Sequence, residues 1–294
     1  MGAQHPECPE RLGAIEDQLI ASGIGQVLLR REAPLAEDEQ LARAHPIEYV
    51  RAIREIAPAQ GTVHLDPDTA MNPYSLNAAL RAAGAAVLAT DMVMTGEADS
   101  AFCGVRPPGH HACRARPMGF CIFNNVAVAV RHALHAHGVE RVAIVDFDVH
   151  HGNGTEDIFE GDAQVLMVST FQHPFYPYSG TEDPASNMVN VPLAAGAGSK
   201  ALQAAVEGRW LPALEAFRPQ LVVFSAGFDA HAEDDMAMLR FSDTDYRWVT
   251  EQVKALAERH AKGRMVSVLE GGYALPALGR SVVQHLRVLA GLNA

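Results

Sequence analysis

Short runs of apolar residues, many of them β-branched, alternate along this chain with longer segments whose apolar positions recur at the spacing of a helix face. This alternation is typical of β-α-β units that build a mainly parallel sheet. The short runs predict strands at residues 98–103, 141–147, 164–169, 220–226 and 264–269. The helical spacing predicts helices at residues 9–21, 46–56, 75–95, 123–137, 199–217, 243–260 and 275–292.

Two of the predicted strands contain runs that are apolar throughout, Val142–Val145 and Leu221–Phe224. A strand with no polar face predicts a sheet that helices cover on both sides. Asp243 and Thr244 are the expected caps of the helix that begins there. Because no repeat, low-complexity tract or Pro/Gly/Ser-rich linker divides the chain, we predict one α/β domain over residues 1–294.

Composition and charge narrow the classes of partner. The formal net charge is −12, and no basic stripe is present to neutralise phosphates, so we expect no nucleic-acid partner. Residues 1–11 are too polar for a signal peptide, and no stretch reads as a membrane span, so we expect no membrane partner. The four cysteines form no CxxC pair, which favours a reducing cytoplasm over a disulfide framework. The sequence leaves a homo-oligomer open.

The first candidate for chemistry is the motif DFDVHHGNG, which directly follows the predicted strand at residues 141–147. Asp146, Asp148 and His150 alternate along an extended chain, so their side chains point the same way. Two carboxylates and an imidazole are ligands that suit zinc. The alternative is an Asp-rich turn in solvent, but three ligand-type residues in register favour the metal site.

The second candidate is SAGFDAH at residues 225–231, again directly after an apolar strand. Alone, Asp229 would be a helix cap or a turn residue. Together with the first motif it completes an Asp-His-Asp set that leaves a coordination position for water, which is typical of catalytic rather than structural zinc sites.

Two further motifs supply acid, base and hydrogen-bond donors. RPPGHHA places His110 and His111 after the predicted strand at residues 98–103, where they are candidates for general base and general acid. Asp146 and Asn153 are their expected orienting partners. EGGY follows the last predicted strand and presents Tyr273, whose phenol could donate a hydrogen bond to a developing oxyanion. In isolation, the two histidines would more simply be surface residues, and Tyr273 would be a core residue.

From His5 to the end of the chain, the sequence resembles the histone deacetylase superfamily, which includes bacterial acetylpolyamine amidohydrolases and acetoin-utilisation proteins. The resemblance is carried by RPPGHHA, GFCIFNN, DFDVHHGNG, SAGFDAH and EGGY. Asn153 and Glu270 look like the class II pattern. The resemblance implies the arginase/deacetylase-like three-layer α/β/α fold with a mainly parallel sheet. The chain looks short at its N-terminus, since family members carry a further strand before His-Pro-Glu.

The resemblance also implies roles for individual residues. It makes Asp148, His150 and Asp229 the zinc ligands, and His110 and His111 the catalytic dyad. Asp146 would bond to His110 and Asn153 would lie near His111, while Tyr273 would polarise the carbonyl. Arg11 would line a product-release pocket.

Substrate and potassium sites follow from the same resemblance. Gly119 and Phe120 would wall an acyl-amine tunnel, with Tyr176 opposite and Met236 on the rim. The loop at residues 58–61 lacks the acid that grips a peptide backbone in some members. Potassium would lie near the zinc, and a second potassium would have its own carbonyl ligands. The expected ligands of the first potassium ion are Asp146, the backbone of Asp148 and His150, Ser169 and the Thr170 carbonyl. Those of the second are the carbonyls around Phe159, Asp162 and Val165.

These observations predict zinc-dependent hydrolysis of linear N-acyl amides, with acetyl-lysine or a small acetylated amine as substrate. One alternative is an acetylpolyamine amidohydrolase, but the apolar Met236 favours acyl-lysine-like or small neutral amides. The neighbouring Asp234 and Asp235 complicate that inference, because either carboxylate could face the site. An arginase-type ureohydrolase would need a second metal and more carboxylates. A non-catalytic acyl-binding homologue would be expected to lose a ligand or Tyr273.

Overall fold

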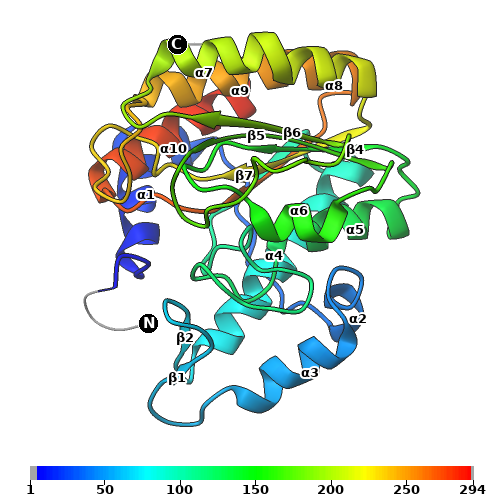
Figure 1. Cartoon of the computed structure of the whole chain (residues 1–294), viewed down its shortest axis with the longest axis vertical. Coiled ribbons are helices and arrows are strands. Elements are labelled where there is room, and N and C mark those ends of the chain that lie inside the picture. Colours follow the sequence, from blue (N-terminus) through cyan, green and yellow to red (C-terminus); the bar gives the residue numbers. More distant parts are fainter. Residues whose placement is uncertain (1–4, 293–294) are drawn as a thin grey trace.

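In a computed structural model, which describes residues 5–292, a six-stranded parallel sheet lies between two layers of helices (Figure 1). Its strands, in their order across the sheet, are β3 (Ser100–Cys103), β8 (Met265–Leu269), β7 (Leu221–Ala226), β4 (Val142–Asp146), β5 (Val165–Gln172) and β6 (Met188–Leu193). Every neighbouring pair is parallel. The predicted three-layer α/β/α fold is confirmed. Residues 1–4 and 293–294, which the predicted domain includes, lie outside the described residues.

The helices form two groups on opposite faces of the sheet (Figure 1). One face is covered by α1 (Glu10–Ala21), α7 (Ser199–Ala205), α8 (Leu211–Phe217), α9 (Asp243–His260) and α10 (Leu275–Leu289). The other is covered by α4 (Ser75–Thr95) and α5 (Asn125–Ala136), with α6 (Asn153–Phe159), α2 (Asp38–Leu41) and α3 (Ile47–Ile56) beside them. A short 3-10 helix (Ile24–Gln26) follows α1, and a small antiparallel pair, β1 (Val63–His64) and β2 (Ala70–Met71), precedes α4.

Successive strand side chains enter two separate cores. Ile144 packs with α4 and α5, whereas its neighbour Val145 packs with the helices of the opposite layer, and both are fully buried. The same division holds for Val223 and Phe224 in β7. Because both faces are covered, most strand positions are buried and apolar, which explains the runs in the sequence.

Some elements differ from the prediction. Strand β6 was not predicted, because Asn190 and Pro192 break its apolar run; an edge strand tolerates a proline since one side needs no partner. Helix α6, which begins inside Gly-Asn-Gly, was not predicted either. The helix predicted at residues 199–217 is interrupted by a π-helical segment, Val206–Trp210. The cap of α9 is Ser242, whose capping box is with Asp245, so the prediction of Asp243 and Thr244 as the caps was wrong.

Helix α4 is long and apolar enough to qualify as a membrane span, although none was predicted from the sequence. Its most apolar window has a mean hydropathy of 1.3, and 61% of that window is buried inside the protein. Alanines account for much of this burial, since they let α4 approach β3 and α5 closely. The helix is therefore packed as part of the core.

The sheet is open at β3. Beside this edge strand runs a groove of about 860 Å³ between α1, α4 and α10. Its apolar lining includes Leu12, Leu19, Leu28, Leu88, Phe102 and Leu286.

Candidate active site

The four sequence motifs meet at one edge of the sheet, where the carboxyl ends of β3, β4, β7 and β8 lie together. Strand register sets this meeting: Asp146 at the end of β4 pairs with Ser225 of β7 and with Ser169 of β5. The loops that leave these strand ends carry the candidate ligands and histidines. This is the edge at which parallel α/β sheets build their sites.

Asp148, His150 and Asp229 form a buried group that could hold a metal ion. Their donor atoms all lie within 4.8 Å of one another. Nδ1 of His150 is 3.0 Å from Oδ1 of Asp148 and 3.3 Å from Oδ2 of Asp229. That Oδ2 atom is buried and accepts no hydrogen bond. Two buried carboxylates with an unused oxygen need a cation, and an O, N, O donor set fits a borderline divalent metal such as zinc.

Glycines make room for these carboxylates. A Cβ atom on Gly227 would collide with the Asp148 carboxylate, and one on Gly271 would collide with that of Asp229. Gly152 is restricted in the same way by Asp146. The glycines of three motifs thus serve close approach of backbone to ligand.

His110 lies among carboxylates. Its Nδ1 is 3.0 Å from Oδ2 of Asp146, and its Nε2 is 3.7 Å from Oδ1 of Asp148. Burial lowers the pKa of His110, but the charges of Asp148 and Asp146 outweigh burial and raise it well above its ordinary value. The side chain of Glu270 holds the loop, because its Oε2 accepts the backbone N–H groups of Gly109 at 2.6 Å and His110 at 3.1 Å. The sequence had marked Glu270 only as a class feature.

His111 lies against an amide instead. Its Nδ1 is 2.7 Å from Oδ1 of Asn153, whose Nδ2 points to the sulfurs of Cys113 and Met118. The amide oxygen therefore accepts the Nδ1 proton, and Nε2 is left as the basic nitrogen. Burial, then the neighbouring positive charges of His110 and His150, lower the pKa of His111 well below its ordinary value. The dyad thus pairs a charged ring with a neutral one.

Tyr273 follows the same edge after β8. Burial raises the pKa of its phenol well above the ordinary value, so the hydroxyl keeps its proton and can donate it. The guanidinium of Arg11 lies 4.9 Å from the centre of its ring. Arg11 is fully buried and donates from Nε to the Gly272 carbonyl at 2.7 Å and from a terminal nitrogen to the Glu270 carbonyl at 2.5 Å. Arg11 therefore holds the loop that carries Tyr273.

Among the predicted substrate-side residues, Gly119 and Tyr176 lie against His111, and Phe120 lies against Tyr273. Gly119 has a φ of +58°, and a Cβ there would collide with the His111 ring. The Phe120 ring centre is 6.1 Å from that of Tyr273, and the Tyr176 ring centre is 5.3 Å from that of His111.

Three neighbours of this group were missed in the sequence. Asp68 and Thr69 accept the backbone N–H groups of Gly119 and Phe120, and Phe175 stacks on His150 at 5.5 Å. Asp68 and Thr69 lie on the loop between β1 and β2, shortly after the loop at residues 58–61, which itself has no acidic residue. Only their position in the sequence near that loop could have indicated them.

Asp234 and Asp235, the two acidic residues near Met236, differ in burial. Asp234 points inward and is 5% exposed, whereas Asp235 is exposed. Oδ2 of Asp234 accepts the N–H groups of Tyr273 at 2.6 Å and Ala274 at 3.0 Å, and Oδ1 accepts that of Met236 at 3.0 Å. The inward carboxylate is thus occupied by the backbone of the Tyr273 loop.

Two of the expected potassium ligands lie side by side, because Asp146 of β4 and Ser169 of β5 are paired in register. At the second expected site, three carbonyl oxygens do converge, but on a side-chain amide. Nδ2 of Asn187 donates to the carbonyls of Phe159, Asp162 and Val165 at 2.9, 3.2 and 3.0 Å.

Comparison with known proteins identifies the family. Residues 5–289 match the model of the histone deacetylase domain. The chain belongs to the histone deacetylase family. A histone deacetylase-like amidohydrolase of Pseudomonas aeruginosa is 43% identical over 294 residues, which cover 97% of this chain and 77% of that protein. The human polyamine deacetylase HDAC10 is 37% identical over 97% of this chain and 45% of its own length. The solved HDA15 HD domain is 37% identical with a TM-score of 0.93, covering 100% of this chain and 85% of that one.

Proposed function

We propose that this chain is a zinc-dependent hydrolase that removes the acyl group from a linear N-acyl amine, as in acetyl-lysine or a small acetylated amine. The observation that carries the proposal is the Asp148–His150–Asp229 group, in which a buried oxygen of Asp229 accepts no hydrogen bond, directly beside a charged and a neutral histidine. The relatives named deacetylase and amidohydrolase support the same class of reaction.

Zinc bound by these three residues would supply a Lewis acid for the substrate carbonyl and lower the pKa of water. A potassium ion at Asp146, Ser169 and the Thr170 carbonyl belongs to the same proposal, and the pairing of Asp146 with Ser169 in register supports it. The other steps depend on side chains of the chain itself.

His111 is the group that accepts a proton from the attacking water, because its ring is neutral and its Nε2 carries a lone pair. The same nitrogen then returns the proton to the leaving amine. His110 stays protonated between Asp146 and Asp148, where its charge opposes premature protonation of His111. Tyr273 donates its hydroxyl proton as a hydrogen bond to the oxygen that becomes negative in the transition state.

Substrate choice depends on the rim. We propose a preference for acyl-lysine-like or small neutral amides, because Met236 is apolar and the carboxylate beside it, Asp234, is occupied by backbone N–H groups. A distal ammonium of a polyamine would then find no free buried carboxylate at this point. Met236→Glu should move the preference towards acetylpolyamines.

The test assays the zinc-loaded chain against an acetyl-lysine peptide and acetylspermidine in parallel, with Asp229→Ala as the inactive control. We expect release of acetate, a better rate with the peptide, and loss of both zinc and activity in the variant. Retention of zinc and activity in Asp229→Ala would refute the metal site. Two equal, adjacent metal ions would favour a ureohydrolase. A better rate with acetylspermidine that Asp235→Ala removes would refute the assignment of the rim.

A further inference from the structure

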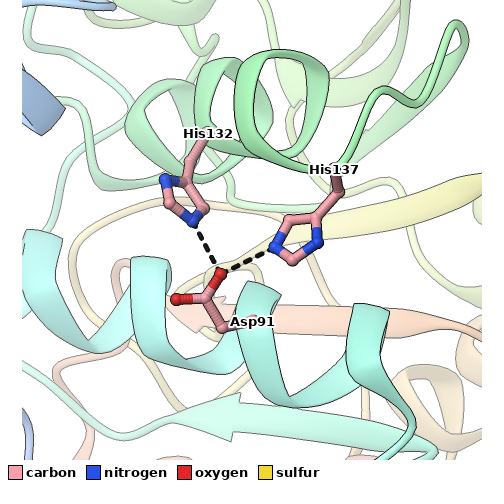
Figure 2. Close-up of side chains that lie close together, drawn as sticks. All are labelled: Asp91, His132 and His137. Carbon is pink, nitrogen blue, oxygen red and sulfur yellow. Dashed lines mark hydrogen bonds and ion pairs between the residues drawn. The ribbon is translucent and has the colours of Figure 1, made fainter.

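A second group of side chains that could bind a metal lies between α4 and α5, away from the active-site loops. Asp91 of α4 faces His132 of α5 and His137, the C-cap of α5 (Figure 2). Nε2 of His132 is 2.7 Å and Nε2 of His137 is 2.6 Å from the same Oδ1 atom of Asp91. Figure 2 shows the second oxygen of Asp91 turned away from both rings.

This group has the composition and spacing of a divalent metal site. One carboxylate and two imidazole nitrogens lie within 4.8 Å of one another. Imidazole and carboxylate are the ligands that Zn²⁺, Co²⁺ and Ni²⁺ share. The carboxyl end of a helix, where His137 lies, also favours a positive charge. We propose that Asp91, His132 and His137 bind one divalent transition-metal ion that bridges α4 and α5, separate from the catalytic centre.

The side chain of Arg43 competes with that ion for His132. Its guanidinium lies 2.5 Å from Nδ1 of His132 and can only donate a hydrogen bond. Nδ1 must then carry the lone pair, which places the proton on Nε2, the atom that the metal needs. Metal binding therefore requires Arg43 to release His132. Arg141, Lys262 and Arg264 line a cavity of about 480 Å³ on which His137 also borders, and their charges weaken cation binding further. The site should thus bind more weakly than the buried Asp-His-Asp group.

The two sites are far apart along α5. Asn125, at the start of α5, donates to the Pro107 carbonyl in the loop of the histidine dyad. The 12 residues of α5 then place its other end roughly 18 Å away, at 1.5 Å per residue. Binding at Asp91 should therefore raise thermal stability and leave turnover unchanged.

The experiment titrates Zn²⁺ and Co²⁺ into the wild-type chain whose catalytic site is already loaded. We expect one further equivalent, lost in His137→Gln and retained in His135→Gln, a matched control on an exposed position of the same helix turn. Arg43→Gln should bind the second ion roughly tenfold more tightly, since a hydrogen bond that opposes binding is removed. The Asp229→Ala variant, which should not bind the catalytic metal, should still bind one equivalent of metal at Asp91. Equal stoichiometry in wild type and His137→Gln would overturn the proposal.

A different observation, the inward carboxylate of Asp234, carries a second inference. Asp234 lies five residues after Asp229 and before Met236, and its carboxylate receives three backbone N–H groups. Two of them, from Tyr273 and Ala274, come from the residues that immediately precede α10, and Ala274 is its N-cap. The carboxylate therefore holds the chain that leads into α10, near the end where the helix dipole favours a negative charge.

We infer that Asp234 is a positioning residue that fixes the main chain of Tyr273, so that the phenol points at the reacting carbonyl; this inference rests on the proposed function. The same carboxylate accepts the backbone N–H of Met236, and so connects the rim to the loop that carries the phenol. A small shift of the substrate-facing loop is then transmitted to Tyr273 through one side chain.

The test is a double-mutant cycle with Asp234→Asn and Tyr273→Phe. Asp234→Asn should lower kcat roughly tenfold or more with little change in KM, because an amide cannot accept all three N–H groups. In the Tyr273→Phe background the same change should have almost no further effect on kcat, since the phenol it positions is gone. Asp235→Asn, at the exposed neighbour, is the matched control and should behave as wild type.

The outcomes separate the two levels of inference. Full additivity of the two substitutions would refute the positioning role and leave only a structural one. An unimpaired Tyr273→Phe would instead contradict the proposed function itself. If Asp234→Asn fails to fold, Asp234→Ser with its kcat and KM measured in both backgrounds provides the same cycle.

Discussion

His110 and His111 follow one another in the sequence and their rings lie 4.1 Å apart, but the structure surrounds them with different groups. The region around His110 is built from the carboxylates of Asp146, Asp148 and Glu270, whereas His111 meets the amide of Asn153. Both rings are almost fully buried, yet the pKa of one is raised and that of the other is lowered. The charge of a buried histidine is therefore decided by its partner rather than by its depth.

His285 extends the comparison to a third environment. It is fully buried in the opposite layer, between the hydroxyls of Thr250 at 2.7 Å and Ser267 at 2.9 Å. Burial without a charged partner lowers its pKa to about 3. Carboxylates thus raise the pKa of a buried histidine, whereas beside an amide or a pair of hydroxyls burial lowers it.

Removing the neutral ring is the largest test of this contrast. His111→Ala should lower kcat by about 10²–10⁴-fold, the usual contribution of a positioned general base, while metal content stays the same. Turnover and metal analysis on one preparation check both statements. Turnover near that of wild type would mean that His110, despite its charge, carries the proton.

Tyr273→Phe sharpens the comparison by separating polarisation from proton transfer. We expect a loss in kcat of about 10²–10³-fold, the cost of one oxyanion donor, with the zinc and the fold intact. Since the histidines are unchanged, the pH–rate profile should keep its shape. A profile that loses one limb would instead assign the titrating group to the phenol.

Asn153→Asp makes the surroundings of His111 resemble those of His110. A carboxylate stabilises the protonated ring, so the pKa of His111 should rise and the acid limb of the pH–rate profile should move to higher pH. At neutral pH we expect a loss of turnover, because more of the rings are protonated, and turnover should recover as the pH is raised. An unshifted acid limb would contradict the assignment of His111 as the base.

His285 gives the smallest effect, and only in acid. Its folded pKa of about 3 lies below the unfolded value of 6.5, so the unfolded chain binds the proton first. Stability is then fully present above pH 6.5 and is lost as the pH falls towards 3. Between pH 7 and pH 5 this histidine should contribute about 2 kcal/mol of that loss, since each pH unit is worth about 1.4 kcal/mol. Urea unfolding of wild type and His285→Gln at both pH values measures it; an equal acid loss in both chains would contradict the prediction.

The sequence predicted the strands, helices and candidate ligands where the signal was local. Asp148, His150 and Asp229 each follow an apolar strand directly, so parallel register alone brings them to one edge. The second-layer contacts were not predictable in this way. Glu270 reaches Gly109 across 161 positions and Asp68 reaches Gly119 across 51, and no spacing rule connects such pairs.

Other contacts were equally hidden from the sequence. The amide of Asn187 donates to the three carbonyls at which the resemblance implied a second potassium ion, and it lies 22 to 28 positions away from them. Asp234 looked equivalent to Asp235 in the sequence, and only burial distinguishes them. The single domain and the roles of the site residues stay predictions.

The contact between Arg11 and the Tyr273 loop has a consequence for synthesis of the protein. Its two hydrogen bonds to the loop join residues 259 and 261 positions apart, almost the whole chain. A chain emerging from the ribosome can form β4 and β5 early, but the phenol cannot take its place until β8 and the start of α10 have left the exit tunnel. Such non-local closure is slow. Chains that are released early would therefore carry complete histidine and aspartate motifs and yet lack the group that finishes the site.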